Sequence, residues 1–503
     1  MKPVDHDKER LPVVAGFHRS ESEVVFIPNA QSSKFSWRKL LAFCGPGFLV
    51  SIAYIDPGNL ATDLAAGSQF KYSLAWIICW ATLMGLILQT LACRLGIVTG
   101  RNLAEICRAE YPRPVTYTLW ALTEVAIIAS DIPEIIGTAF ALNLLFKIPL
   151  FVGVLITGLD TLLLLAVQQY GVRKLEAMIG VLIAIMSLCF IVEMFMSQPS
   201  PIEVLEGVLI PRMGGDAIFI GVSLVGAVVM PHNIYLHSAL VQSRHVDRKN
   251  QNELTQANFY FLIESSVALF VSCLINVAVI SLAGSKLYPD PDGTVTLQNA
   301  YEILGNVLQS SVAPYFWAIG LLASGQSSTL TGTYAGQFVM QGFLNLQIKP
   351  WIRNLITRSV AIIPSLVIAL IAQEKGANSL IIVSSAILSF QLPFALVPLL
   401  KFSSSEKIMG KSAAGGVLLV FTWTLSAFII LSNVWLILST VIPIIPSNAS
   451  GVLAWLFLSI VALVYFCILG YLVHRPVTGR LDQEEAKCLL MSEQHDDEST
   501  ATP

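Results

Sequence analysis

The sequence predicts an all-α polytopic membrane protein, on the evidence of its composition, its apolar runs and the placement of its basic residues. Of the 503 residues, 55% are hydrophobic and only 13% are charged, whereas a soluble globular protein carries about 25% charged residues. Apolar runs of about 20 residues, long enough to cross a bilayer, recur along the chain. We expect twelve such spans, near residues 42–70, 73–98, 114–141, 150–169, 175–196, 214–242, 256–283, 313–342, 354–372, 378–400, 413–440 and 452–473.

Basic residues predict the orientation of these spans. With a cytosolic N-terminus, 25 of the 30 lysines and arginines fall in cytosolic segments, as the positive-inside rule requires. We therefore expect both termini in the cytosol. The predicted parts are a cytosolic tail (1–40), a core of spans 1–10 (41–401), spans 11 and 12 (402–473), and a second cytosolic tail (474–503).

The two tails are polar and should be irregular, and no cleaved signal peptide precedes the first span. The sequon Asn448-Ala449-Ser450 falls in the last external loop, where glycosylation is an open option. The 8 cysteines show no CxxC spacing, so we expect packing residues and no disulfide framework. A plasma membrane and a vacuolar or endosomal membrane both fit the sequence.

Two spans are interrupted in matching places. The first carries Asp56-Pro57-Gly58-Asn59, and the sixth carries Met230-Pro231-His232-Asn233. Proline and glycine break a helix there and free backbone carbonyls, and an intramembrane acid costs several kcal/mol by the milder estimates. Because the breaks lie five spans apart, they predict an inverted repeat of spans 1–5 and 6–10 with a substrate site at the midplane. The alternative is that each proline only kinks a packed helix.

The residues at the breaks favour a transition-metal ion as the substrate. They offer the Asp56 carboxylate, the Asn59 amide and the Met230 thioether, and the carbonyls of Ala53 and Ala227 lie one turn before each break. Oxygen ligands alone would suit magnesium or calcium, whereas a sulfur beside a carboxylate favours a softer ion such as Mn²⁺ or Fe²⁺. The alternative for Met230 is a role in packing only.

A second set of titratable residues predicts a proton pathway that includes Asp56. Glu124, Asp131 and Glu134 lie near one face of the third span, as in a proton relay or a water-lined path. A buried hydrogen-bond network between helices is the alternative. His232, beside the second break, is a candidate proton acceptor. Arg353 at the cytosolic end of the ninth span could pair with the inner acid or serve as an anchor.

Three stretches together resemble the Nramp family of proton-coupled divalent metal transporters, especially its plant members. They are "DPGN" in the first span, "MPHN" followed by "IYLHSALVQSR" in the sixth, and "GQSSTLTGTYAGQFVMQGFLNL" from Gly325 to Leu346. The resemblance implies a LeuT-type fold of ten core helices plus two, with metal bound by Asp56, Asn59, Met230, Ala53 and Ala227. Ser385 stands where many members carry an amide side chain in span 10, and Gln391 is a candidate substitute.

The predicted function is secondary transport of Mn²⁺ or Fe²⁺ toward the cytosol with protons as the coupling ion. Cd²⁺, Co²⁺ and Zn²⁺ are further candidate substrates. We expect no cofactor, no nucleic-acid partner and no enzymatic activity, and a monomer should suffice for transport. The absence of an HExxH motif and of a Walker loop supports this reading. The alternatives are a metal-sensing membrane receptor and a sodium-coupled organic-solute transporter of the same fold.

Overall fold

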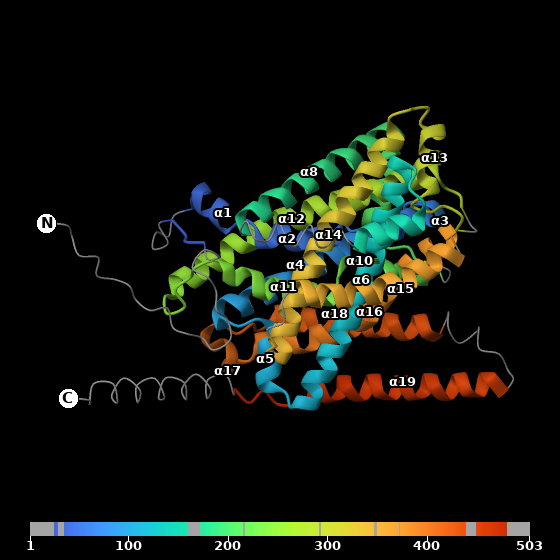
Figure 1. Cartoon of the computed structure of the whole chain (residues 1–503). Helices are drawn as coiled ribbons and strands as arrows, with labels where there is room; N and C mark the ends of the chain where they lie inside the picture. The colour runs from blue at the N-terminus through green and yellow to red at the C-terminus, as the bar shows by residue number, and fades with distance from the viewer. Residues whose placement is uncertain are drawn as a thin grey trace, which may run out of the picture.

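The computed structural model describes residues 25–28, 35–158, 172–214, 217–290, 293–346, 350–371, 373–438 and 449–479. In these residues the protein is a bundle of helices (Figure 1). The helices are α1 (Trp37–Phe43), α2 (Pro46–Ser51), α3 (Pro57–Phe70), α4 (Ala75–Thr99), α5 (Leu103–Glu110), α6 (Arg113–Phe146), α8 (Val172–Ser197), α9 (Pro201–Leu209), α10 (Ile218–Val228), α11 (Pro231–Leu240), α12 (Gln251–Lys286), α13 (Asn299–Val307), α14 (Ala313–Leu344), α15 (Pro350–Ile371), α16 (Gln373–Ser404), α17 (Glu406–Met409), α18 (Val417–Leu436) and α19 (Ala449–His474).

Both interrupted spans are broken at the residues that the sequence indicates. A short 3₁₀ turn, Ile52–Tyr54, follows α2, and α3 begins at Pro57. In the sixth span α10 ends at Val228 and α11 begins at Pro231. Proline stands at the first position of both second halves, where its missing N–H is not needed by the helix. Each span is therefore two half-helices separated by a buried break.

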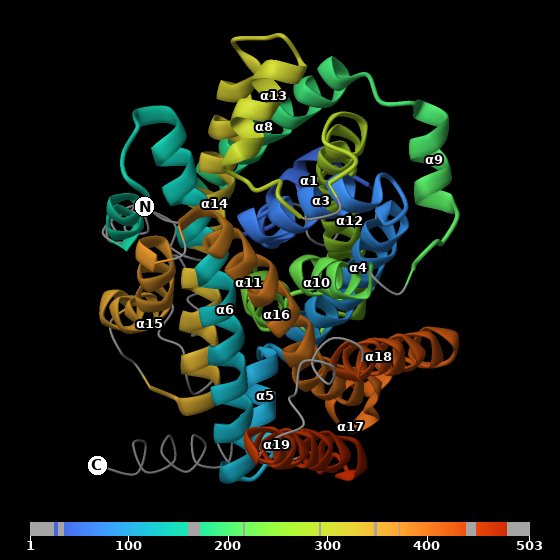
Figure 2. The ribbon, with the colours of Figure 1, turned by 90° about the vertical axis from the view of Figure 1, so that its right-hand side faces the viewer.

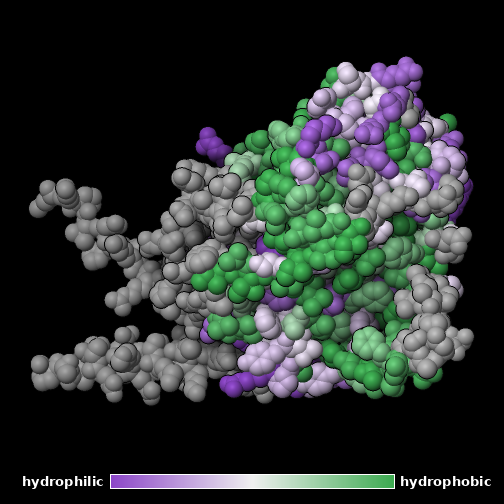
Figure 3. Space-filling model, turned by 45° about the vertical axis from the view of Figure 1, so that its right-hand side comes forward, coloured by the Kyte–Doolittle hydropathy of each residue, from purple (hydrophilic) through white to green (hydrophobic). Residues whose placement is uncertain are grey.

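Eight helices in the described part are long and apolar enough to cross a membrane. The twelve expected spans therefore remain a prediction. The expected spans that are not among these eight helices are missing for different reasons. The first span is divided into α2 and α3, and the fourth falls mostly on residues 159–171, outside the described residues. In α14 the serine-, threonine- and glycine-rich stretch lowers the hydropathy. Figure 3 shows hydrophobic residues across the middle of one face of the molecule, as expected of a surface that faces lipid.

The last two helices lie at the edge of the bundle. Figure 2 shows α18 and α19 beside α16, and both pack against that helix. Only 22% and 11% of their apolar windows are buried, compared with 89% for residues Ile218–Ser243. The second broken span is thus at the centre of the protein, and α18 and α19 are peripheral.

The described ends of the chain lie on the same side of the bundle. Val25 pairs with the backbone of Ser243 and His245, which attaches residues 25–28 to the bundle. Near the C-terminus, Thr478 donates two hydrogen bonds to Glu110 of α5. Helix α5 is tied in turn to α11, because the Leu103 N–H donates to Ser238 Oγ at 2.9 Å. These contacts place residues 25–28 and 475–479 on the same side.

Four short helices occupy segments that the sequence analysis treated as loops: α5, α9, α13 and α17. Helix α9 is attached to the end of α3 by a 2.5 Å ion pair between Lys71 and Glu203. The hydrogen bond from Lys71 to Glu203 raises the pKa of Lys71 above its usual value. Because both side chains are about half exposed, this pair contributes little to stability.

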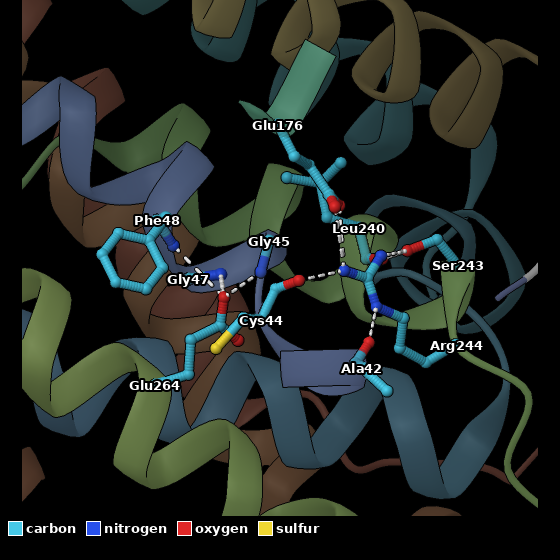
Figure 4. Close-up of polar contacts among 10 residues, drawn as sticks. All are labelled: Ala42, Cys44, Gly45, Gly47, Phe48, Glu176, Leu240, Ser243, Arg244 and Glu264. Carbon is cyan, nitrogen blue, oxygen red and sulfur yellow. Dashed lines mark hydrogen bonds and ion pairs between the residues drawn. The ribbon is translucent and has the colours of Figure 1, made fainter. Parts of the chain in front are cut away.

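The start of α2 is held from two sides (Figure 4). Glu264 of α12 accepts hydrogen bonds from the N–H groups of Gly45, Gly47 and Phe48, at 2.5, 2.9 and 3.4 Å. A carboxylate at a helix N-terminus is favoured by both the unpaired N–H groups and the helix dipole. Arg244 donates to the carbonyls of Ala42 and Cys44. The first half-helix is therefore fixed at its N-terminal end by two charged side chains.

A buried ion pair extends this attachment to α8. Arg244 lies 2.9 Å from Glu176, and the two side chains are 0% and 8% exposed. Gly45 adopts φ +144°, which favours glycine, and a Cβ there would lie 2.1 Å from the Glu176 carboxylate. The absence of a side chain at residue 45 lets this ion pair approach the backbone.

Candidate metal-transport site

The first break ends in a carboxylate that caps the next half-helix. Asp56 is the N-cap of α3, and its Oδ1 accepts a 2.8 Å hydrogen bond from the Asn59 N–H. Aspartate is among the preferred N-cap residues because it satisfies an unpaired N–H of the first turn. Asp56 is 1% exposed and Asn59 is 0% exposed. The break thus holds two polar side chains in the interior of the protein.

The Asn59 amide brings the two breaks together. Its Nδ2 donates to Asp56 Oδ1 at 2.7 Å, to the Ala53 carbonyl at 3.1 Å and to the Ala227 carbonyl at 3.0 Å. Two of these oxygens belong to the first break and the third belongs to α10 of the second span. Three oxygens therefore converge on one point between the broken spans.

Met230 lies at the second break as the N-cap of α11. It is 3% exposed and belongs to a small apolar cluster with Ala53, Ala126, Ala129 and Leu388. Met230 therefore packs beside one of the residues whose carbonyl faces the convergence point. At the first break, Asp56 Oδ2 and Asn59 Oδ1 are also buried, and neither atom has a hydrogen-bond partner among the described residues.

Other carbonyls freed by the first break are satisfied by neighbouring helices. The Asn276 amide of α12 donates to the Tyr54 carbonyl at 2.8 Å, and Ser324 Oγ of α14 donates to the Ile55 carbonyl at 2.7 Å. Buried backbone groups must be paired within a membrane protein. These donors explain how the break is tolerated, and the sequence analysis missed them because single polar residues in α12 and α14 carry no local signal.

Ser385 of α16 lies next to the first break. A Cβ built on Gly58 would be 3.3 Å from Ser385 Oγ and 3.2 Å from Asp56 Oδ2, so the hydroxyl lies close to the carboxylate. Gln391 is half-buried with an unpaired Oε1, and no polar contact of the described residues brings it to either break. The geometry favours Ser385 over Gln391 as a neighbour of the site.

The sequence model of the Nramp family, described as Natural resistance-associated macrophage protein-like, matches residues 47–439. "Metal transporter Nramp3" of Oryza sativa subsp. japonica is 50% identical over 455 residues, covering 88% of this chain and 82% of the relative. "Metal transporter Nramp6" of Arabidopsis thaliana is 49% identical over 480 residues, with 92% and 91% coverage. The chain belongs to the Nramp family.

Solved structures agree with the predicted LeuT-type, all-α fold of this Nramp protein. A manganese transporter of Eremococcus coleocola has a TM-score of 0.81 at 33% identity and covers 89% of this chain and 97% of its own. Mhp1, a nucleobase-cation-symport-1 family transporter, has a TM-score of 0.53 at 16% identity, with 79% and 91% coverage. The second similarity concerns the fold alone.

Two acids of α6 in this Nramp protein face a buried arginine. Arg358 of α15 lies 2.9 Å from Glu134 Oε2 and 3.8 Å from Asp131 Oδ1, and all three side chains are at most 4% exposed. Gly332 of α14 leaves room for them, since a Cβ there would lie 3.2 Å from Asp131 Oδ1. Asp131 and Glu134 thus form one cluster with a basic partner.

The basic partner differs from the one that the sequence analysis named. The side chain of Arg353 lies outside the described residues. Arg358, which the sequence analysis included only in its count of 25 cytosolic lysines and arginines, is the residue that contacts the acids. Glu124 is separate from this cluster, because it is partly exposed and accepts a 3.1 Å hydrogen bond from Trp120 Nε1. Arg358 stands about one turn inside the predicted ninth span (354–372), next to Thr357 and Ser359, and nothing else in the local sequence indicates that it is buried.

The two histidines of α11 differ in their surroundings. His237 Nδ1 lies 2.8 Å from Gln89 Oε1, and Gln89 Nε2 donates to Tyr54 Oη at 3.3 Å. His232, 2% exposed, has an Nδ1 without a hydrogen-bond partner in the described part of the chain. His237 therefore belongs to a polar chain that links α11, α4 and the first break, and His232 keeps a free ring nitrogen beside the second break.

Proposed function

We propose that this Nramp protein is a secondary transporter that moves Mn²⁺ or Fe²⁺ toward the cytosol together with protons. The observation that carries this proposal is the convergence of Asp56 Oδ1 and the carbonyls of Ala53 and Ala227 on the Asn59 amide. Three oxygens that meet a single donor within 3.1 Å also suit a bound cation. The name of the Eremococcus coleocola relative, a manganese transporter, supports the choice of ion.

In the proposed complex the cation replaces the Asn59 Nδ2 group among these oxygens. The amide then turns so that Oδ1 faces the ion, which is a rotation that side-chain amides make readily. Asp56 supplies the only carboxylate of this set and Met230 supplies sulfur. A thioether adds affinity for a softer first-row ion and little for calcium or magnesium. The proposed ligands would therefore attract a cation through the Asp56 carboxylate and favour a softer ion through the Met230 sulfur.

For the protons, we propose a pathway from Asp56 and His232 to Asp131, Glu134 and Arg358. Support comes from the burial of the acids beside a basic side chain, since intramembrane ionisable groups usually mark ion paths. Glu124 would lie nearer the end of this path. Entry of protons down their gradient would supply the energy for metal uptake.

Uptake of Mn²⁺ into liposomes that contain the purified protein tests the transport proposal. We expect time-dependent Mn²⁺ accumulation above that of protein-free liposomes, with Fe²⁺ competing and organic solutes such as amino acids having no effect. Accumulation of an amino acid with Na⁺ would favour the alternative of an organic-solute transporter. Binding of Mn²⁺ without accumulation would favour a receptor.

A further inference from the structure

Two cysteines from distant parts of the chain have adjoining thiols. Cys79 on α4 and Cys273 on α12 lie with their sulfur atoms 3.7 Å apart, although 194 positions separate them in the sequence. Both are free cysteines in the structure, and nothing in the local sequence indicates that they adjoin. Neither residue belongs to the transport site or to the acidic cluster with Arg358.

We propose that Cys79 and Cys273 form a modification site at which hydrogen peroxide oxidises the two thiols to a disulfide that joins α4 to α12. A disulfide requires the sulfurs to approach to about 2.05 Å. Helices α4 and α12 already pack directly against each other. The remaining gap of less than about 2 Å is within the range that side-chain rotation and a small backbone shift can close.

The position of the pair gives a small neutral oxidant access to it. Both thiols are partly exposed. The next residue along each helix, Trp80 or Leu274, is exposed at 51% or 47%, so the pair faces the outside of the bundle. In a membrane this surface faces lipid, which hydrogen peroxide crosses. The predicted topology also places the start of α4 outside the cytosol, where disulfides persist.

The 3.7 Å contact between the sulfurs lets the two thiols react in turn. In the proposed reaction Cys79 loses its proton and is the attacking sulfur. It attacks the O–O bond of the peroxide, gives a sulfenic acid and releases one water. Cys273 then attacks that sulfur and releases the second water. Two thiols lose two electrons and two protons, and one peroxide is reduced to two waters.

Peptide mapping of the full-length protein in liposomes tests this proposal. The protein is reduced with dithiothreitol, treated with hydrogen peroxide, blocked with N-ethylmaleimide and digested without reduction. We expect a peptide pair linked through Cys79 and Cys273 that separates on reduction. Cys79→Ser and Cys273→Ser should abolish the linked pair, whereas Cys467→Ser, which removes an exposed thiol of α19, should retain it.

Thermal unfolding of the same samples gives a second readout. A disulfide that closes a long loop restricts the unfolded chain, so the oxidised wild-type protein should unfold at a higher temperature than the reduced one, and Cys79→Ser should show no difference. Recovery of both residues as alkylated thiols or as separate sulfonic acids, with no linked peptide, would overturn the proposal. A link from either residue to another cysteine would overturn it as well.

Discussion

The Asn59 side chain forms hydrogen bonds to both broken spans and so links them directly. Its Nδ2 contacts two oxygens of the first span and the Ala227 carbonyl of the sixth. A metal ion at this point would hold the same three oxygens through its charge. In the proposed site, selectivity would depend on Met230, because calcium and magnesium usually far exceed manganese and iron in concentration and an all-oxygen site would bind them.

Replacement of Met230 tests its role in selectivity. Met230→Ala leaves the carboxylate, the amide and the carbonyls in place, so Mn²⁺ uptake should persist. We expect the ratio of Ca²⁺ to Cd²⁺ uptake to rise roughly tenfold, which corresponds to about 1.4 kcal/mol of differential affinity. Both ions are measured in the same proteoliposome preparation. If the ratio does not change, Met230 serves packing only and selectivity has another source.

Neutralisation of one acid in α6 separates proton movement from metal binding. Glu134→Gln removes a carboxylate that pairs with Arg358 and is not among the proposed metal ligands. Proton influx should therefore fall more strongly than Mn²⁺ affinity, and Asp131→Asn should behave in the same way. Proton influx and Mn²⁺ binding are measured side by side. Equal losses in both quantities, or no loss in either, would assign these acids to helix packing.

Removal of the arginine should destabilise the protein. Arg358→Ala leaves two buried carboxylates without their basic partner, and breaking a buried pair costs about 3–5 kcal/mol. We expect a clear decrease in the unfolding temperature, partly reversed in the double variant Arg358→Ala/Glu134→Gln because one stranded charge is gone. Arg113→Ala, at an exposed position, is the control. A decrease no larger than that of the control would contradict the buried pairing.

Individual residues were predicted from the sequence where a local pattern marks them. Asp56, Asn59 and Met230 stand beside helix-breaking prolines, so their grouping at two breaks was foreseeable. Arg358, Asn276 and Ser324 were not predicted, because their roles arise from contacts across 222 to 269 positions of the chain. Local spacing contains no information about such partners.

At the scale of elements, a broken helix needs donors from its neighbours. Helices α12 and α14 supply them to the first break, and α12 also supplies Glu264 to the start of α2. The half-helix α2 is therefore held at both ends by side chains of other helices.

Substitution of Glu264 tests the attachment of α2. A hydrogen bond to a charged group contributes about 1.5–3 kcal/mol, and Glu264→Gln replaces the carboxylate with a weaker neutral acceptor. We expect faster modification of Cys44, just before α2, by a water-soluble maleimide, followed peptide by peptide with mass spectrometry. Glu253→Gln, in the first turn of the same helix, is the matched control. Equal modification rates in wild type and Glu264→Gln would show that other contacts hold α2.

Elements with a strong apolar period were predicted well, and short ones were not. The sequence identified the long spans and both breaks because length and proline position are local properties. Helices α5, α9 and α13 were missed, since eight or nine residues between spans resemble loops and depend on packing for stability. Helix α14 differs from the other long helices. Its many serines and threonines give it a modest hydropathy, and contacts with neighbouring helices stabilise it.

At the scale of the whole molecule, the two broken spans lie at the centre and the described chain ends meet on one side. This arrangement fits an inverted repeat whose halves share one site. Helices α18 and α19 contribute none of the described residues that converge on that site.

The central claim is that the metal ion binds at the two breaks and that its movement is coupled to protons. Mn²⁺ uptake and internal pH are measured together in proteoliposomes, with and without an external acid gradient, for wild type and Asp56→Ala. We predict that the gradient accelerates wild-type uptake, that Mn²⁺ addition acidifies the lumen, and that Asp56→Ala lowers uptake more than about 100-fold while remaining folded. Wild-type uptake that ignores the pH gradient, or near-normal uptake by Asp56→Ala, would contradict this account.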